Sequence, residues 1–84
     1  LVLFSHYCTI DEDIEVMYKK VSETGQILVH IEIPDAKYCF RQMDCIVPTY
    51  EVTNVVGMSK EEIDKYVNFC KLNAHLLLEN KVLD

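Results

Sequence analysis

Four polar side chains are the first candidates for chemistry in this sequence: Lys19, His30, Glu32 and Arg41. Histidine changes charge near neutral pH, so His30 can serve as a general acid, a general base or an anion contact. Glu32 lies two residues further along the chain, and on a strand that spacing places both side chains on one face. We prefer a second interpretation, in which the same residues are solvated cross-strand pairs on the wet face of a sheet, each pair contributing about 0.2–1 kcal/mol.

The other histidines do not complete a recognisable ligand set. His6 and Cys8 share a face if their segment is a strand, but a closed zinc site has four ligands and the remaining ones cannot be assigned. His75 falls on the flank of a predicted helix, where we expect a surface residue. Neither a Gly-rich phosphate loop nor an HExxH or GxSxG motif occurs. The sequence therefore predicts no metal and no cofactor.

The four cysteines, Cys8, Cys39, Cys45 and Cys70, each lie within an apolar pattern. A small disulfide scaffold is rich in loops, whereas this chain contains only two glycines and two prolines. We therefore expect reduced thiols and a cytoplasmic protein. If a disulfide forms, the expected pair is Cys39–Cys45, whose spacing does not fit a CxxC zinc motif.

Composition limits the classes of function. The chain has 84 residues, half of them apolar, which fits one small folded domain over residues 1–84. Eight basic residues against fourteen acidic ones give a net charge of −6, and this balance argues against binding to a nucleic-acid backbone. No stretch of about 20 apolar residues occurs, so we expect no membrane span. A core this small gains stability from association, so we expect a homo-oligomer or a partner protein.

Alternation of apolar residues predicts the strands that position the polar candidates. It is clearest over residues 26–33, and we expect strands over 14–21 and 37–42 on either side, forming an antiparallel meander. Residues 11–21 also fit an amphipathic helix. We prefer the strand because its apolar set then falls on the same face as that of the next strand. The first ten residues fit a strand or an extended tail, and another strand is expected to start near Thr49.

The predicted hairpin turns bring the polar candidates into one row. A turn tip at residues 24–25, where Gly25 supplies a positive φ, places Lys19 opposite His30. A second tip at residues 35–36 places Arg41 opposite His30 from the other side. The same turns define a predicted core register.

In that register, Ile31 lies between two aromatic residues, Tyr18 and Phe40. All three then face the helix, and the polar row faces away from it.

Residues 59–80 have the pattern of a capped helix. Ser59 and Glu62 form a capping box. One apolar stripe is expected to pack on the sheet and consists of Ile63, Val67, Cys70, Ala74 and Leu77. A second stripe lies roughly opposite and consists of Phe69, Leu72 and Leu76. This second stripe is expected to be covered either by the N-terminal segment or by another protein chain.

The segment from about Gln26 to Asn80 resembles a small bacterial family known as domain of unknown function 4160. The likeness lies in "VHIEIPDAKYCF", "YEVTNVVGMSKEEIDKYV" and "NAHLLLEN". The Pro-Pro-His-x-His run of that family is represented only by His30. The resemblance implies a small regulatory or partner-binding protein associated with toxin–antitoxin partners.

We therefore predict an α+β fold: a three- or four-stranded antiparallel meander with one long C-terminal helix packed on one face. The leading functional hypothesis is a small bacterial protein-interaction or regulatory module. It would associate with itself or with a partner protein through Phe69, Leu72 and Leu76. The alternative is a small hydrolase or toxin-like enzyme that uses the sheet face with the four polar candidates.

Overall fold

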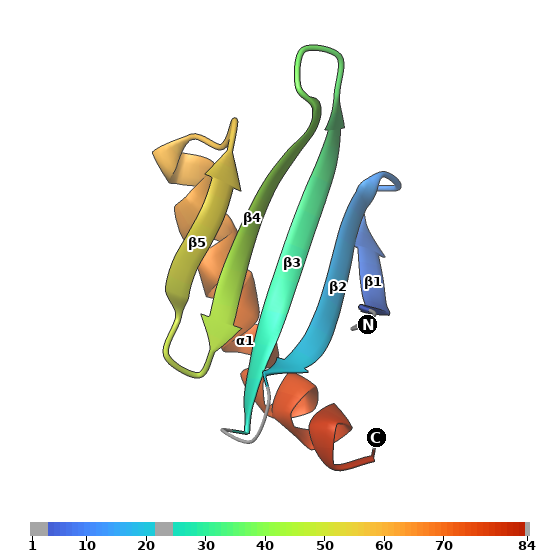
Figure 1. Ribbon diagram of the computed structural model, residues 1–84, viewed down its shortest axis with the longest axis vertical. Helices are drawn as coiled ribbons and strands as arrows, with labels where there is room; N and C mark the ends of the chain where they lie inside the picture. The colour runs from blue at the N-terminus through green and yellow to red at the C-terminus, as the bar shows by residue number, and fades with distance from the viewer. Residues whose placement is uncertain (1–3, 22–24, 84) are drawn as a thin grey trace.

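The computed structural model describes residues 4–21 and 25–83, and within them five antiparallel strands form one sheet crossed by one helix (Figure 1). The elements are β1 (Ser5–Ile10), β2 (Ile14–Val21), β3 (Gln26–Asp35), β4 (Cys39–Val47), β5 (Glu51–Val56) and α1 (Lys60–Leu83). Each strand pairs with the next along the chain, so the sheet is a meander. The α+β class and the long C-terminal helix are confirmed, whereas the predicted number of strands is too low.

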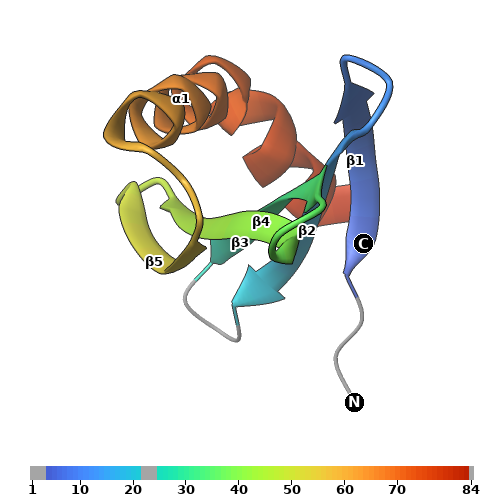
Figure 2. The same ribbon diagram turned by 90° about the horizontal axis from the view of Figure 1, so that it is seen from above.

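Strand β1 accounts for part of this difference, because the structure pairs it with β2, with Cys8 opposite Val16. Tyr7 is an extra residue in this pairing, and its ring packs edge-on against Phe69 of α1 with 6.3 Å between the ring centroids. The Tyr7 hydroxyl also donates a hydrogen bond to Asn73 at 2.9 Å. Figure 2 shows β1 standing beside α1, so the first strand covers one flank of the helix.

The β2–β3 hairpin has the predicted faces but not the predicted partners. Strand β2 forms in place of the alternative helix, and Val16, not Tyr18, lies opposite Ile31. Because side chains alternate along a strand, this shift of two residues leaves each one on its predicted face. Gly25 has the expected positive φ, at 80°. The predicted tip residue Thr24 lies outside the described residues.

The predicted β3–β4 register is wrong by three residues, because Met43, not Phe40, lies opposite Ile31. An odd shift moves every β4 side chain to the other face of the sheet. Phe40 is therefore 49% exposed, while Met43 is buried. The turn is wider than a two-residue tip: the Asp35 carboxylate accepts hydrogen bonds from two backbone N–H groups of the turn, at 2.9 and 3.1 Å. Cys39 then enters β4 with a positive φ of 66°.

The helix begins as the capping box predicts. The Ser59 backbone N–H donates to the Glu62 carboxylate at 3.0 Å, and the Glu62 backbone N–H donates to the Ser59 hydroxyl at 3.1 Å. Strand β5 precedes it in the place expected for the fourth strand, and Gly57 follows β5 with a φ of 71°. Sequence and local structure therefore agree over the last third of the chain.

The core lies between α1 and the sheet face that the helix covers. Its buried apolar side chains are Ile14, Val16, Ile27, Val29, Ile31, Ile33, Met43, Cys45, Val47, Tyr66, Cys70 and Leu77. The other members of the predicted helix stripe, Ile63, Val67 and Ala74, are partly buried against this core. Tyr66 is a buried helix residue that the predicted stripe did not include.

Candidate functional site

A band of polar side chains crosses the sheet on the face opposite α1. Alternation along β3 places His30 and Glu32 there, because Val29 and Ile31 belong to the core beneath the helix. Every strand contributes to this polar band, which consists of His6, Glu15, His30, Glu32, Asp44 and Asn54. It contains two of the four polar residues predicted from the sequence.

His30 is held between two carboxylates near the middle of the polar band. Its Nδ1 lies 2.5 Å from the Asp44 carboxylate, and its Nε2 lies 2.8 Å from the Glu32 carboxylate. The second oxygen of Asp44 accepts a hydrogen bond from the Asn54 amide at 2.8 Å. The side chains of His30 and Asp44 are only 12% and 7% exposed, so the expectation of a solvated histidine is wrong. Each ring nitrogen of His30 therefore has a carboxylate as its hydrogen-bond partner.

The band continues toward β1 through a more exposed group. His6 Nε2 lies 3.4 Å from the Glu15 carboxylate, which also accepts a hydrogen bond from the Thr9 hydroxyl at 2.8 Å. Glu15 lies directly opposite Glu32 in the β2–β3 ladder. Like charges in directly opposed positions destabilise a sheet. Here each of the two carboxylates has its own histidine partner, His6 for Glu15 and His30 for Glu32.

Lys19 lies on the same face as His30, but it is not the direct neighbour of the ring. Its partner in the ladder is Leu28, because the register differs by two residues from the predicted one. The Lys19 ammonium lies 4.9 Å from the centroid of the Phe4 ring, and the Phe4 ring lies 5.3 Å from the His30 ring. The Phe4 ring therefore lies within contact range of both the lysine and the histidine.

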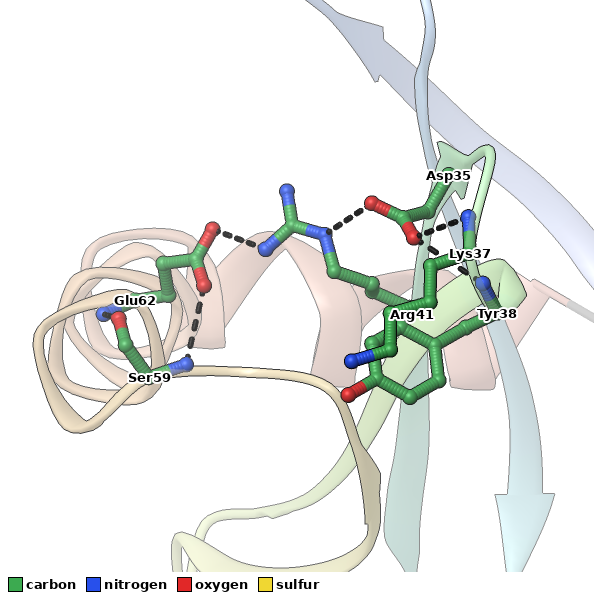
Figure 3. Close-up of polar contacts among 6 residues, drawn as sticks. All are labelled: Asp35, Lys37, Tyr38, Arg41, Ser59 and Glu62. Atoms are coloured by element: carbon green, nitrogen blue, oxygen red, sulfur yellow. Dashed lines mark hydrogen bonds and ion pairs between the residues drawn. The ribbon is translucent and has the colours of Figure 1, made fainter.

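Arg41 lies on the opposite face of the sheet from the polar band, as a consequence of the β3–β4 register. It pairs with Ile33, and its Nη1 donates to the Glu62 carboxylate at 2.6 Å (Figure 3). Its Nε lies 3.3 Å from the Asp35 carboxylate. A Cβ on Gly57 would lie 2.9 Å from the Arg41 side chain, which fits the glycine at this position. Arg41 therefore ties the β3–β4 turn to the first turn of α1.

Electrostatics agree with this structural role. The hydrogen bond to Glu62 raises the pKa of the Arg41 guanidinium, although partial burial opposes the shift. The backbone N–H of Ser59, followed by Arg41, holds the pKa of the Glu62 carboxyl below its ordinary value. The charged forms of both residues are thus favoured at the start of the helix. The predicted row of Lys19, His30 and Arg41 does not form.

The four cysteines are free thiols. Cys39 and Cys45 lie on the same strand, six residues apart, which separates them by roughly 20 Å and rules out the predicted pair. Cys45 and Cys70 are instead neighbours across the core. The hydrogen bond with Cys45, together with burial, raises the pKa of the Cys70 thiol far above its ordinary value. Cys70 is therefore an unreactive thiol in the folded protein.

The geometry of the polar band limits its chemistry. Both ring nitrogens of His30 already face carboxylates, so proton transfer to a substrate would require one of these hydrogen bonds to break. Over residues 4–21 and 25–83, no cluster of three or more His, Cys, Asp or Glu side chains is arranged to hold a metal ion. The arrangement is best suited to orienting carboxylates that are partly removed from water.

The second group of predicted residues lies on α1, and we call Phe69, Leu72 and Leu76 the helix flank. Phe69 is partly buried, because Tyr7 of β1 packs against it. Leu72 is 73% exposed and Leu76 is 44% exposed. The N-terminal strand therefore covers one end of the helix flank, and the two leucines are left in solvent.

Comparison with known protein families, with curated proteins and with solved structures found no match. The resemblance to domain of unknown function 4160 accordingly stays a prediction. No helix in the described part of the chain has the length and apolar character needed to span a membrane.

Sequence reasoning missed Asp44, Asn54 and Tyr7. The sequence did contain a signal for Asp44. Met43, Cys45 and Val47 alternate with Asp44 and Ile46, as they would on a strand that continues past residue 42. The contact between Tyr7 and the helix had no comparable local signal, because the two residues it joins are 66 positions apart.

Proposed function

We propose that this protein acts by association with another polypeptide, through the helix flank on α1. The observation that carries the proposal is the exposure of Leu72 and Leu76, two large apolar side chains one helical turn apart. Exposed apolar side chains that group on one surface mark interaction sites more often than isolated ones do. The resemblance noted in the sequence adds a class of partner: a protein encoded beside the chain, of the toxin–antitoxin kind.

Association by addition of a strand to the sheet is disfavoured by both edges. Strands β1 and β5 form the edges, and the pairing of each with its neighbour is irregular. The irregularity in β1 is at Tyr7, and the one in β5 is near Asn54. Bulges of this kind interrupt the row of backbone groups that an incoming strand would use. The helix flank is therefore the better candidate surface.

The enzyme alternative loses its geometric basis. It required Arg41 beside His30 on one face of the sheet, and the ladder places Arg41 on the other face. The remaining contacts of His30 satisfy the ring without leaving a nitrogen free.

A matched pair of substitutions tests the proposal. Leu76→Asp and Val56→Asp introduce the same charge at apolar positions of similar exposure, 44% and 40%, on α1 and on β5. The tagged chain is purified from its native cells after crosslinking, and co-purifying chains, including further copies of this one, are quantified by mass spectrometry. We expect a stoichiometric partner with wild type and Val56→Asp and its loss with Leu76→Asp, with circular dichroism confirming that both variants fold. Equal recovery of the partner with wild type and both variants would overturn the proposal.

A further inference from the structure

The helix flank belongs to a longer stripe that ends in opposite charges. Lys65, Phe69, Leu72, Leu76 and Glu79 follow one another at intervals of four, three, four and three residues along α1. This is the spacing of a seam between two packed helices. Lys65 and Glu79 are exposed, and each lies seven residues from Leu72, on either side. The stripe is thus apolar at its centre, basic at one end and acidic at the other.

Such a stripe is complementary to itself when reversed. In a two-fold symmetric dimer, the same surface of each copy meets the other, so a residue on one side of the axis faces a residue on the other side. With the axis near Leu72 and the helices antiparallel, Lys65 of each copy lies opposite Glu79 of the second copy. Parallel helices would instead oppose lysine to lysine and glutamate to glutamate.

We infer that the occupant of the helix flank is a second copy of this chain, packed with the two α1 helices antiparallel. The inference rests on the proposed function and names its partner. The stripe from Lys65 to Glu79 is about 21 Å long at 1.5 Å per residue, so the contact involves four turns of each helix. Leu72 lies at its centre, where the interface excludes water, and the two ion pairs lie at its rim and determine the orientation.

Charge reversal at the two ends provides the test. Lys65→Glu and Glu79→Lys each replace two attractive contacts per dimer by two repulsive ones, and we expect each to raise the dimer dissociation constant by roughly tenfold. Because one variant carries only acids at these positions and the other only bases, a mixture of the two should form heterodimers in preference to either homodimer. The double variant Lys65→Glu/Glu79→Lys should recover the wild-type dissociation constant. Lys37→Glu, on the β3–β4 turn and outside the stripe, controls for net charge.

Sedimentation equilibrium gives the dissociation constants, and native mass spectrometry of the isotopically labelled mixture gives the heterodimer fraction. A wild-type protein that stays monomeric at millimolar concentration would overturn the inference, while the proposed function would still be judged by partner recovery. A wild-type dimer that Leu76→Asp leaves intact would overturn both. A dimer that Leu76→Asp dissociates but that ignores the charge reversals would overturn the antiparallel arrangement alone.

Discussion

Replacement of His30 by leucine removes the ring that joins Asp44 to Glu32 and keeps an apolar side chain of similar size beside Phe4. Breaking a buried charged pair costs about 3–5 kcal/mol when the remaining charge has no other partner. Asp44 is almost fully buried but retains its hydrogen bond from Asn54, and Glu32 is partly exposed. We therefore expect a smaller loss, about 2–3 kcal/mol. That is a large part of the roughly 4–13 kcal/mol typical of a domain of this length.

Urea unfolding followed by circular dichroism measures this loss, and a double-mutant cycle assigns it. His30→Leu, Asp44→Asn and the double variant are compared, and the double variant should cost about 1–2 kcal/mol less than the sum of the single ones. His6→Leu is the matched control, because the same change at the exposed end of the polar band should stay within about 0.5 kcal/mol. A loss below about 0.5 kcal/mol for His30→Leu, or strict additivity with Asp44→Asn, would refute the reasoning.

Three further predictions concern the cap, the core and the thiols. The pKa of Glu62 is lowered from an ordinary value of 4.5, so its charged form stabilises the fold above about pH 4.5 and this contribution is lost as the pH falls through the folded value. The stability difference between wild type and Glu62→Gln should shrink in that range, and a difference that stays constant with pH would contradict this contribution of the cap. Ile31→Ala, which leaves a void between β2, β4 and the helix, should destabilise by about 2–5 kcal/mol in urea unfolding, and a loss below about 1 kcal/mol would contradict the observed packing. Brief alkylation followed by intact-mass measurement should modify Cys39 alone in the native protein and all four cysteines after unfolding, and rapid modification of a second thiol in the folded state would be inconsistent with the structure.

Features that depend on short-range periodicity were predictable from the sequence. The buried face of β3 follows from alternation, and the start of α1 follows from Ser59 and Glu62, because both signals lie within a few residues of the structure they determine. Register across a turn is different, because it depends on the conformation of every turn residue. The hydrogen bonds of the Asp35 carboxylate and the positive φ of Cys39 define a turn that shifts the β3–β4 register by three residues from the predicted one. Phe40 was predicted to be buried because it is a large aromatic residue.

The error in the β3–β4 register also made the predicted candidate site wrong. The register shift of three residues placed Arg41 on the other face of the sheet and Asp44 opposite His30. The sequence thus predicted a histidine between cations, whereas the structure has a histidine between carboxylates. The prediction of the helix flank was affected less. Its residues lie on one helix, whose periodicity alone placed Leu72 and Leu76 on a common face.

The order of the strands in the sheet has a consequence for how the chain folds. Every strand pairs with its neighbour in sequence, so each hairpin closes only a short loop and can form early. The apolar face of β3 is covered only when α1, which follows all five strands, docks onto it. Before that step the chain is a paired sheet with one bare apolar surface, which is the species most prone to aggregate. Docking of the helix, and not pairing of the strands, is then the step that separates productive folding from aggregation.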